Sequence, residues 1–179
     1  MKKYVLAVTG LLLFAVTNAN AETGAYGGVS VGSSVVKETS EGVTFKGNDF
    51  AWAVWGGYML NDNFGIEAGW ADWGKPDDTI EGIKAEIDAS GYQVVLLGVL
   101  PINDNIDLLG KAGVAIWESE YFIESVSFGE DDGNDLALGI GARWNMESGL
   151  GIRAELEWYD IPDTDRAWLM MVGLQWNFK

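Results

Sequence analysis

The sequence predicts an all-β fold, an eight-stranded antiparallel up-and-down transmembrane β-barrel. Apolar residues recur at every second position in repeated rows, which is the side-chain period of a strand. Charged residues within these rows fall on the face opposite the aromatic residues. Nine tryptophans, six tyrosines, seven phenylalanines and 24 glycines in 179 residues, with only three prolines, suit long strands with aromatic belts better than helices.

The last row, residues 167–179, shows the alternation most clearly. Its alternate positions are Trp168, Met170, Val172, Leu174, Trp176 and Phe178. Rings at both ends with aliphatic residues between them are typical of a strand whose outer face meets lipid, with aromatic residues at both headgroup levels. A soluble sheet is the alternative interpretation of this row on its own.

Seven earlier rows follow the same rule. They span about residues 24–36, 50–60, 64–70, 92–100, 106–116, 136–146 and 150–158. An even strand count places both termini in the periplasm. The aromatic belt that we expect to face lipid comprises Trp52, Tyr58, Phe64, Trp70, Trp144, Trp158, Trp168, Trp176 and Phe178.

The connections between the rows alternate in length. Turn-forming residues occupy the short connections 61–63, 101–105 and 147–149. We expect the longer polar segments 37–49, 72–90, 118–135 and 160–166 to be outer loops, although 83–88 and 121–128 alternate as if hairpins continue beyond the bilayer. Short periplasmic turns and long outer loops are the pattern of outer-membrane barrels.

The amino terminus predicts secretion. Lys2 and Lys3 precede an apolar run over about residues 4–16, and Ala19, Asn20 and Ala21 form a small-residue cleavage site. We therefore expect residues 1–21 to be a signal peptide and residues 22–179 to form one barrel domain. A membrane-anchoring helix is the alternative, but the apolar run is short for a span.

Composition excludes several classes of function. Without the two signal lysines, nine basic residues face 27 acidic ones, so nucleic acid is not expected as a partner. The chain has no cysteine and no histidine, which excludes disulfides, thiolate sites, histidine-ligated zinc and histidine-based catalytic triads. We expect no cofactor and no enzyme activity.

Six charged residues are expected to point into the barrel: Glu67, Lys111, Arg143, Arg153, Glu155 and Glu157. A soluble eight-stranded barrel such as a lipocalin would have the opposite arrangement, with an apolar interior. Three acids and three bases in a narrow lumen are expected to pair. A gate or ion path is one interpretation; a packed ionic plug is favoured, because eight strands enclose little more than their own side chains and Trp117 and Tyr159 also point inward. A glycosidase pair at Glu155 and Glu157 lacks a substrate cleft.

Acidic residues dominate the expected outer loops. The oxygen-rich group Glu130, Asp131, Asp132 and Asp135 is a candidate for weak calcium or magnesium binding that bridges to lipopolysaccharide phosphates. Its spacing is not that of a known calcium loop, and a solvated acidic rim is the favoured interpretation.

Three segments carry a family resemblance: GIEAGWADWG at 65–74, VVLLGVLP with IDLLGKAGVAIW at 94–101 and 106–117, and MVGLQWNF at 171–178. They resemble the transmembrane domain of outer membrane protein A and its small relatives, including outer membrane protein X. The resemblance implies an integral outer-membrane monomer that contacts lipid and lipopolysaccharide and is assembled by the barrel assembly machinery. Glu67, Lys111, Arg143 and Arg153 resemble that family's inner ionic network. A periplasmic wall-binding domain and its tethering role are not carried over.

Three functions remain open from the sequence. The first is a structural or surface-interaction barrel with acidic outer loops, a plugged lumen and an external ligand that the sequence does not identify. The second is a narrow, low-conductance porin-like channel. The third, a membrane-embedded lipid A deacylase or omptin-like protease, is disfavoured because those families use histidine.

Overall fold

The computed structural model describes residues 24–40, 43–80, 82–146, 148–162 and 164–178, and the all-β prediction is confirmed. The expected signal peptide, residues 1–21, lies outside the described residues. None of the described residues forms a helix long and apolar enough to cross a membrane. The strands are β1 (Gly24–Ser40), β2 (Val43–Met59), β3 (Phe64–Asp72), β4 (Asp77–Ile80), β5 (Ile83–Pro101), β6 (Ile106–Ile123), β7 (Val126–Asn145), β8 (Leu150–Tyr159) and β9 (Arg166–Asn177).

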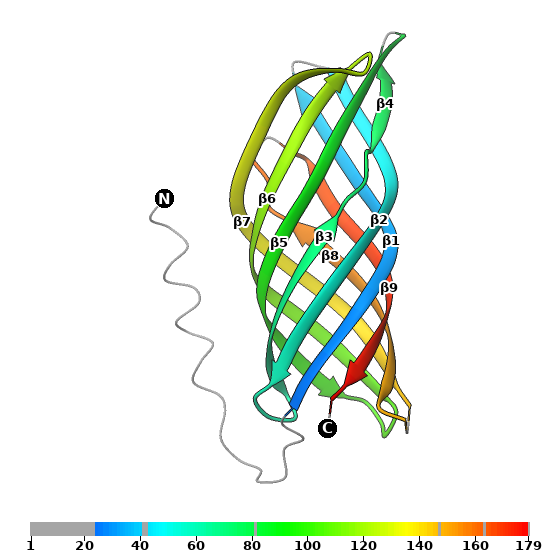
Figure 1. Cartoon of the computed structure of the whole chain (residues 1–179), viewed down its shortest axis with the longest axis vertical. Helices are drawn as coiled ribbons and strands as arrows, with labels where there is room; N and C mark the ends of the chain where they lie inside the picture. The colour runs from blue at the N-terminus through cyan, green and yellow to red at the C-terminus, as the bar shows by residue number, and fades with distance from the viewer. Residues whose placement is uncertain (1–23, 41–42, 81, 147, 163, 179) are drawn as a thin grey trace.

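Eight of these strands close into an antiparallel ring (Figure 1). The order around the barrel is β3-β2-β1-β9-β8-β7-β6-β5, and β3 pairs with β5 to complete it. The first and last strands are therefore neighbours, with Val31 opposite Val172. The short strand β4 is a ninth segment that pairs with β5 alone, beyond the end of β3.

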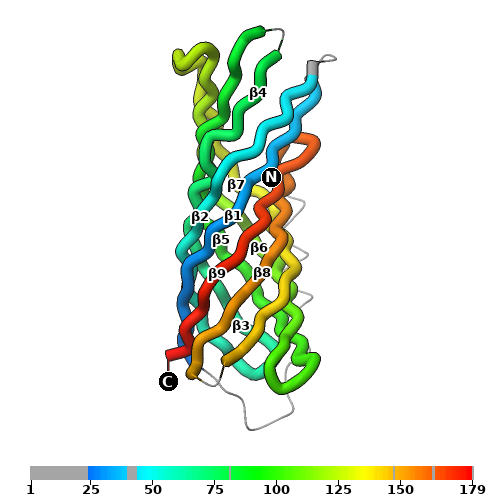
Figure 2. The backbone as a smooth tube through the Cα atoms, turned by 90° about the vertical axis from the view of Figure 1, so that its right-hand side faces the viewer, coloured from blue at the N-terminus to red at the C-terminus, as the bar shows by residue number. Residues whose placement is uncertain are grey.

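The barrel has two unlike ends. At the lower end in Figure 1, where β1 begins and β9 ends, short turns join β2 to β3, β5 to β6 and β7 to β8. Asn61 and Asn103 stabilise two of these turns, because each side-chain oxygen accepts backbone N–H bonds two and three residues further on. At the upper end the strands reach different heights, as the tube in Figure 2 shows.

Three segments expected to be outer loops are largely strand. Residues 72–90 contain β4 and the start of β5, so the strand expected at 83–88 is confirmed. β1 and β2 stay paired from Gly24 opposite Met59 up to Ser40 opposite Val43, and β6 and β7 stay paired up to Ile123 opposite Val126. The expectation of a polar loop at 37–49 is therefore wrong. The extension expected around 121–128 is confirmed and covers nearly all of 118–135. The polar sequence correctly indicated that these segments lie in water. It did not exclude strands, because the backbone hydrogen bonds of a hairpin form outside lipid as well.

The two faces of the strands are as predicted. On β9 the exposed side chains are Met170, Val172, Leu174 and Trp176, while Leu169, Met171 and Gln175 between them are buried. The inward positions hold two apolar clusters. The upper one includes Trp73, Trp117 and Tyr159, and the lower one consists of Tyr26, Trp55, Leu97, Val99 and Leu109.

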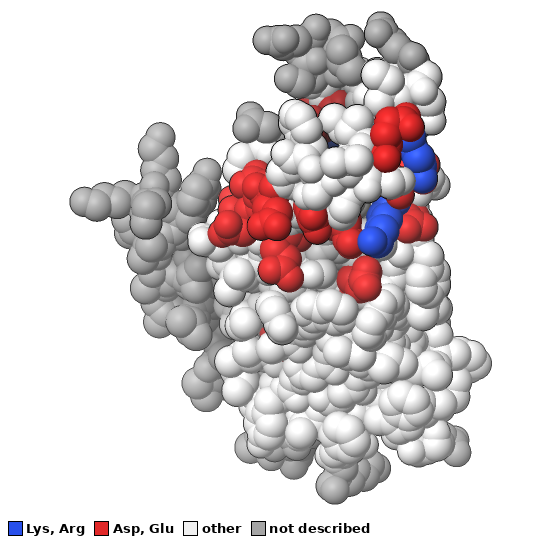
Figure 3. All heavy atoms as spheres, turned by 45° about the horizontal axis from the view of Figure 1, so that its top comes forward, with Lys and Arg blue, Asp and Glu red and all other residues white. Residues whose placement is uncertain are grey.

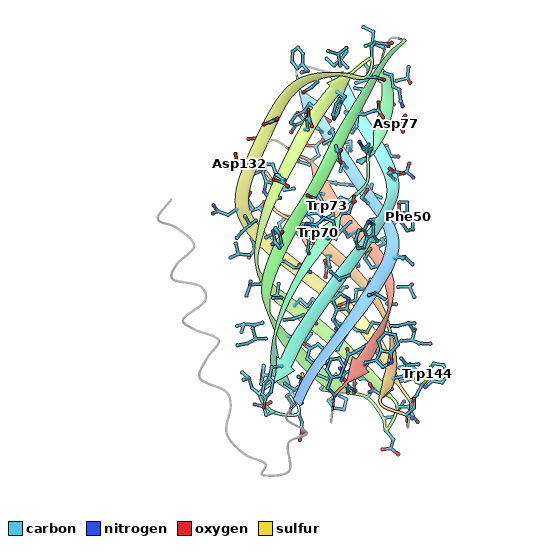
Figure 4. All side chains as sticks on the ribbon, in the orientation of Figure 1. Phe50, Trp70, Trp73, Asp77, Asp132 and Trp144 are labelled. Carbon is cyan, nitrogen blue, oxygen red and sulfur yellow. The ribbon has the colours of Figure 1, made fainter. Side chains whose placement is uncertain are left out.

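The predicted aromatic residues form two girdles on the outer wall. Tyr58, Phe64, Trp144, Trp176 and Phe178 lie near the lower turns, and Trp144 projects outward there in Figure 4. Trp52, Trp70, Trp158 and Trp168 lie higher, where Trp158 pairs with Trp168 and the rings of Trp52 and Trp70 meet edge to face, 5.0 Å apart. Between the girdles the exposed side chains are aliphatic, which is the surface that a bilayer requires.

Candidate functional site

The candidate site is a cluster of five charged side chains inside the barrel, Glu67, Lys111, Arg153, Glu155 and Glu157, here named the central ionic cluster. They come from β3, β6 and β8, and none has a side chain more than 8% exposed. The inward parity of each strand positions them, because neighbouring residues on the same strands face lipid. Charges that would be intolerable outside are thereby gathered inside.

Lys111 holds the three carboxylates together. Its Nζ lies 2.7 Å from Glu67 Oε1, 2.8 Å from Glu155 Oε1 and 2.9 Å from Glu157 Oε1. An ammonium has three donors, so this one side chain meets three acids at hydrogen-bonding distance. Lys111 is the hub of the cluster.

Arg153, which is fully buried, adds the second cation. Its Nη1 lies 2.8 Å from Glu67 Oε2, its Nη2 lies 2.6 Å from Glu155 Oε1, and Nη1 also donates to Gln175 Oε1 at 3.2 Å. The guanidinium carbon lies 4.0 Å from the centre of the Trp55 ring, a cation–π contact. The planar fork of arginine bridges two acids and a ring in a way that a lysine could not.

Neutral donors complete the cluster. The Tyr159 hydroxyl donates to Glu157 Oε2 at 2.6 Å, Gln93 Nε2 donates to Glu157 Oε1 at 3.3 Å, and the Tyr26 hydroxyl donates to Glu67 Oε2 at 3.2 Å. Tyr159 belongs to the upper apolar cluster and Tyr26 to the lower one. The charged cluster is thus in direct contact with both apolar clusters.

Arg143 does not join the central ionic cluster by any hydrogen bond or ion pair within the described part of the chain. Its Nε and Nη2 instead donate to Asp107 Oδ2 at 3.0 and 2.7 Å, and Asn145 Nδ2 donates to the same oxygen at 2.6 Å. Asp107 lies one residue from the lower end of β6 and is buried. The lumen was expected to hold three acids and three bases. With Asp107 included, four acids face three bases.

The candidate cation ligands Glu130, Asp131, Asp132 and Asp135 lie along the upper half of β7. Asp131 is opposite Ser119, which is buried, whereas Glu130 and Asp132 are opposite Glu120 and Glu118. Asp135 accepts a hydrogen bond from Trp117 Nε1 at 2.8 Å. Figure 4 shows Asp132 pointing away from the barrel. The four side chains leave the strand in alternate directions, and within the described ranges no group of three or more acidic residues is arranged to hold a metal ion.

Acidic residues of the upper end gather in a zone on the face that Figure 3 shows, where they are red above a largely white lower surface. Two lysines lie in this zone. The hydrogen bond from Lys75 to Asp88, 2.9 Å long, raises the pKa of Lys75, and the bond from Lys84 to Glu86 raises the pKa of Lys84. Each lysine is therefore held in its charged form by a neighbouring acid.

Sequence reasoning missed the inward side chains Tyr26, Trp55, Trp73 and Gln93, and it left Asp107 and Gln175, which alternate with the outward rows, out of the ionic network. A signal was present for five of them, since each lies on a strand or at its edge with the parity of an inward residue. Tyr26 and Trp55 were left unassigned, although the alternation that places Trp117 and Tyr159 inside applies to β1 and β2 as well. Trp73 follows the end of β3, so periodicity could not have placed it.

Comparison with known proteins agrees with this geometry. The family model described as "Outer membrane protein beta-barrel domain" matches residues 5–178. Outer membrane protein P5 of Haemophilus influenzae is 30% identical over 88% of this chain and 52% of its own length, and outer membrane protein A of Shigella dysenteriae is 26% identical over 88% and 48%. The chain spans about half the length of the curated relatives it matches.

Among solved structures, Neisserial surface protein A superposes with a TM-score of 0.66 at 12% identity, covering 87% of this chain and 99% of the other. That likeness concerns the fold alone. The predicted resemblance to the small barrels of the outer membrane protein A kind is confirmed by the family model and the curated relatives together. The chain belongs to the outer membrane protein β-barrel domain family and is an integral β-barrel of the bacterial outer membrane.

Proposed function

We propose that this protein is a structural and surface-interaction barrel whose lumen is closed to ions, and not an enzyme. The observation that carries the proposal is the contact of Lys111 with three carboxylates at 2.7 to 2.9 Å. Four further polar side chains, Arg153, Tyr26, Gln93 and Tyr159, also bond these acids. A current would have to separate these buried pairs, and separating a buried pair costs several kcal/mol.

Planar-bilayer recording of the refolded protein tests this proposal. We expect no steady conductance steps for the wild-type chain. Regular steps whose size changes in Arg143→Gln or Arg153→Gln would instead support the narrow, low-conductance channel. A matched control is Lys37→Gln, because Lys37 pairs with Asp165 at the exposed upper end and lies outside the lumen.

The proposed orientation places the lower end in the periplasm and the acidic upper end outside the cell. It rests on the short turns and on both strand termini at the lower end. Ser125→Cys, in the β6–β7 turn, should react with a membrane-impermeant maleimide on intact cells, and Asn103→Cys, in the lower turn, should not. The reverse labelling pattern would invert the orientation.

The remaining parts of the proposal concern assembly. Residues 1–21 are removed as a signal peptide, so the mature chain begins at Glu22, which mass spectrometry of the purified protein measures. The barrel is inserted by the barrel assembly machinery as a monomer and contacts lipopolysaccharide through its outer wall. The acidic zone is a solvated rim, because the candidate divalent-cation ligands Glu130, Asp131, Asp132 and Asp135 diverge along β7.

A further inference from the structure

The upper end of the protein carries an apolar surface far from the region that lipid covers. Its members, here named the tip surface, are Ile83 on β5, Ile123 on β6, and Val126 and Phe128 on β7. Ile83 lies nine residues beyond Tyr92, a ring at the level of the upper girdle, which corresponds to roughly 30 Å of strand. Hydrocarbon cannot account for these side chains.

The members of the tip surface are exposed. Phe128 is 79% exposed, Val126 68%, Ile83 52% and Ile123 39%. Ile123 pairs with Val126 across the hairpin and with Ala85 on β5, two residues from Ile83. Lys84 and Glu124 fix the neighbouring strands together by a backbone bond and a side-chain bond. Adjacent exposed apolar residues on a soluble surface are typical of an interaction site.

Ile83, Ile123 and Val126 of the tip surface continue the inward face of the sheet, and Phe128 lies beside them at the register shift of β7, between Ser127 opposite Phe122 and Gly129 opposite Tyr121. Ala85 and Tyr121, which lie on the same face one step lower, pack against the upper apolar cluster. The apolar face thus rises from the core and then becomes uncovered where the hairpins extend past β8 and β9. A covered lower part and an uncovered upper part of one face indicate that a further molecule covers the upper part.

The charge around the tip surface indicates which kind of partner would bind there. Over residues 75–80, 82–90 and 117–135 the basic residues are Lys75 and Lys84. The acidic residues of the same ranges are Asp77, Asp78, Glu86, Asp88, Glu118, Glu120, Glu124, Glu130, Asp131, Asp132 and Asp135. A polyanion or a second copy of this chain would bring like charge to this surface, whereas a cationic partner would be attracted to it.

We infer that the tip surface docks a cationic amphipathic polypeptide segment, whose apolar side chains cover Val126 and Phe128 while its lysine or arginine residues meet the acidic zone below. The inference names a partner class for the surface-interaction role in the proposed function and rests on that role. It does not depend on whether the lumen conducts, which bilayer recording tests separately.

The test is a binding measurement on the whole refolded barrel in phosphatidylcholine nanodiscs. The probe is a fluorescent, 18-residue amphipathic peptide of leucine and lysine, and anisotropy is measured at 0.15 M salt against empty nanodiscs. We expect the double variant Val126→Ser/Phe128→Ser to weaken binding at least ~10-fold, because two apolar contacts are lost. Glu130→Gln/Asp132→Asn should weaken it too, with a smaller salt dependence.

Controls separate this surface from nonspecific attraction. Ile102→Ser removes a 55% exposed apolar side chain at the opposite end and should leave binding unchanged. Polylysine should bind more weakly than the amphipathic peptide, and an amphipathic peptide of leucine and glutamate should not bind. Equal binding by the tip variant, equal binding by polylysine, or wild-type binding no greater than that of empty nanodiscs would overturn the inference. Concentration-dependent association of the wild-type barrel that Val126→Ser/Phe128→Ser abolishes would overturn it in favour of a second copy.

Discussion

Replacement of Arg153 by methionine should be among the most damaging single changes inside this barrel. Arg153 is fully buried and bonds Glu67, Glu155 and Gln175 while it stacks on Trp55. Methionine fills part of the volume but carries no charge. Glu67 and Glu155 would then share Lys111 with Glu157 as their only cation.

The magnitude follows from the charge count of the central ionic cluster. Three acids and two bases leave a formal charge of about −1 in the wild type, and Arg153→Met makes it about −2. Breaking a buried pair by removal of one partner costs about 3–5 kcal/mol, because the remaining charge stays uncompensated. We therefore expect the free energy of unfolding to fall by about that amount.

Equilibrium urea unfolding in lipid vesicles, followed by tryptophan fluorescence, measures this difference. Lys37→Met is the matched control, since it breaks the exposed pair with Asp165 and should cost less than about 1 kcal/mol. Arg153→Met combined with Glu67→Gln restores the charge of about −1, and we expect it to recover part of the loss. A cost below about 1 kcal/mol for Arg153→Met, or a double variant less stable than the single one, would refute the account of the cluster.

Three further predictions concern other parts of the molecule. Val172→Arg, midway between the two girdles on β9, should lower the free energy of unfolding by about 2–4 kcal/mol in the same assay. Ser127→Arg near the upper turn should change it by less than about 0.5 kcal/mol. Equal effects of the two variants would argue against the assigned membrane region. Gly74→Ala should destabilise the protein more than Gly82→Ala. Both glycines have positive φ, 71° and 88°, but only at Gly74 would an added Cβ lie 2.3 Å from the Phe50 carbonyl oxygen. Equal melting temperatures of the two variants would contradict this. Hydrogen bonds from the Thr39 hydroxyl and Lys37 hold the pKa of Asp165 below its ordinary 3.8, so these bonds contribute stability at higher pH that is lost as the pH falls through the lowered value. In a carbon NMR titration of the Asp165 carboxyl, Thr39→Val should raise this pKa. An unchanged pKa would show that the Thr39 hydroxyl does not cause the shift.

Much of the fold was predictable because the strand period is local. The alternation within a single segment such as Trp168 to Phe178 identifies its two faces without knowledge of the neighbouring strands. A closed barrel requires only that every strand points its apolar face outward. The height of the hairpins was less predictable. Glu118 and Asp132 face each other across β6 and β7, and such a pair of like charges gives no sequence signal for a strand.

Most charged residues of the lumen were predictable, but Asp107 was left out of the set and the pairing could not be predicted. Parity placed Glu67, Lys111 and Arg153 inside, whereas the contact of Lys111 with Glu67 joins β6 to β3, which are not neighbours around the ring. Which acid each base meets depends on strand tilt and stagger, and these are properties of the closed barrel. Arg143 illustrates the point, because it is opposite Arg153 in register but turns to Asp107.

The unequal charge of the lumen explains why tyrosine and glutamine lie beside the acids. Glu67 and Glu155 each meet two cations, but among the described residues Lys111 is the one cation that Glu157 meets. The Tyr159 hydroxyl and the Gln93 amide supply the donors that a third cation would otherwise supply. Neutral donors stabilise a carboxylate without adding a charge that must itself be desolvated. Tyr159 donates to Glu157 along its own strand, whereas Gln93 reaches Glu157 from β5, which is not a neighbour of β8 around the ring. The Gln93 bond therefore connects separate parts of the wall through the lumen, between the two apolar clusters.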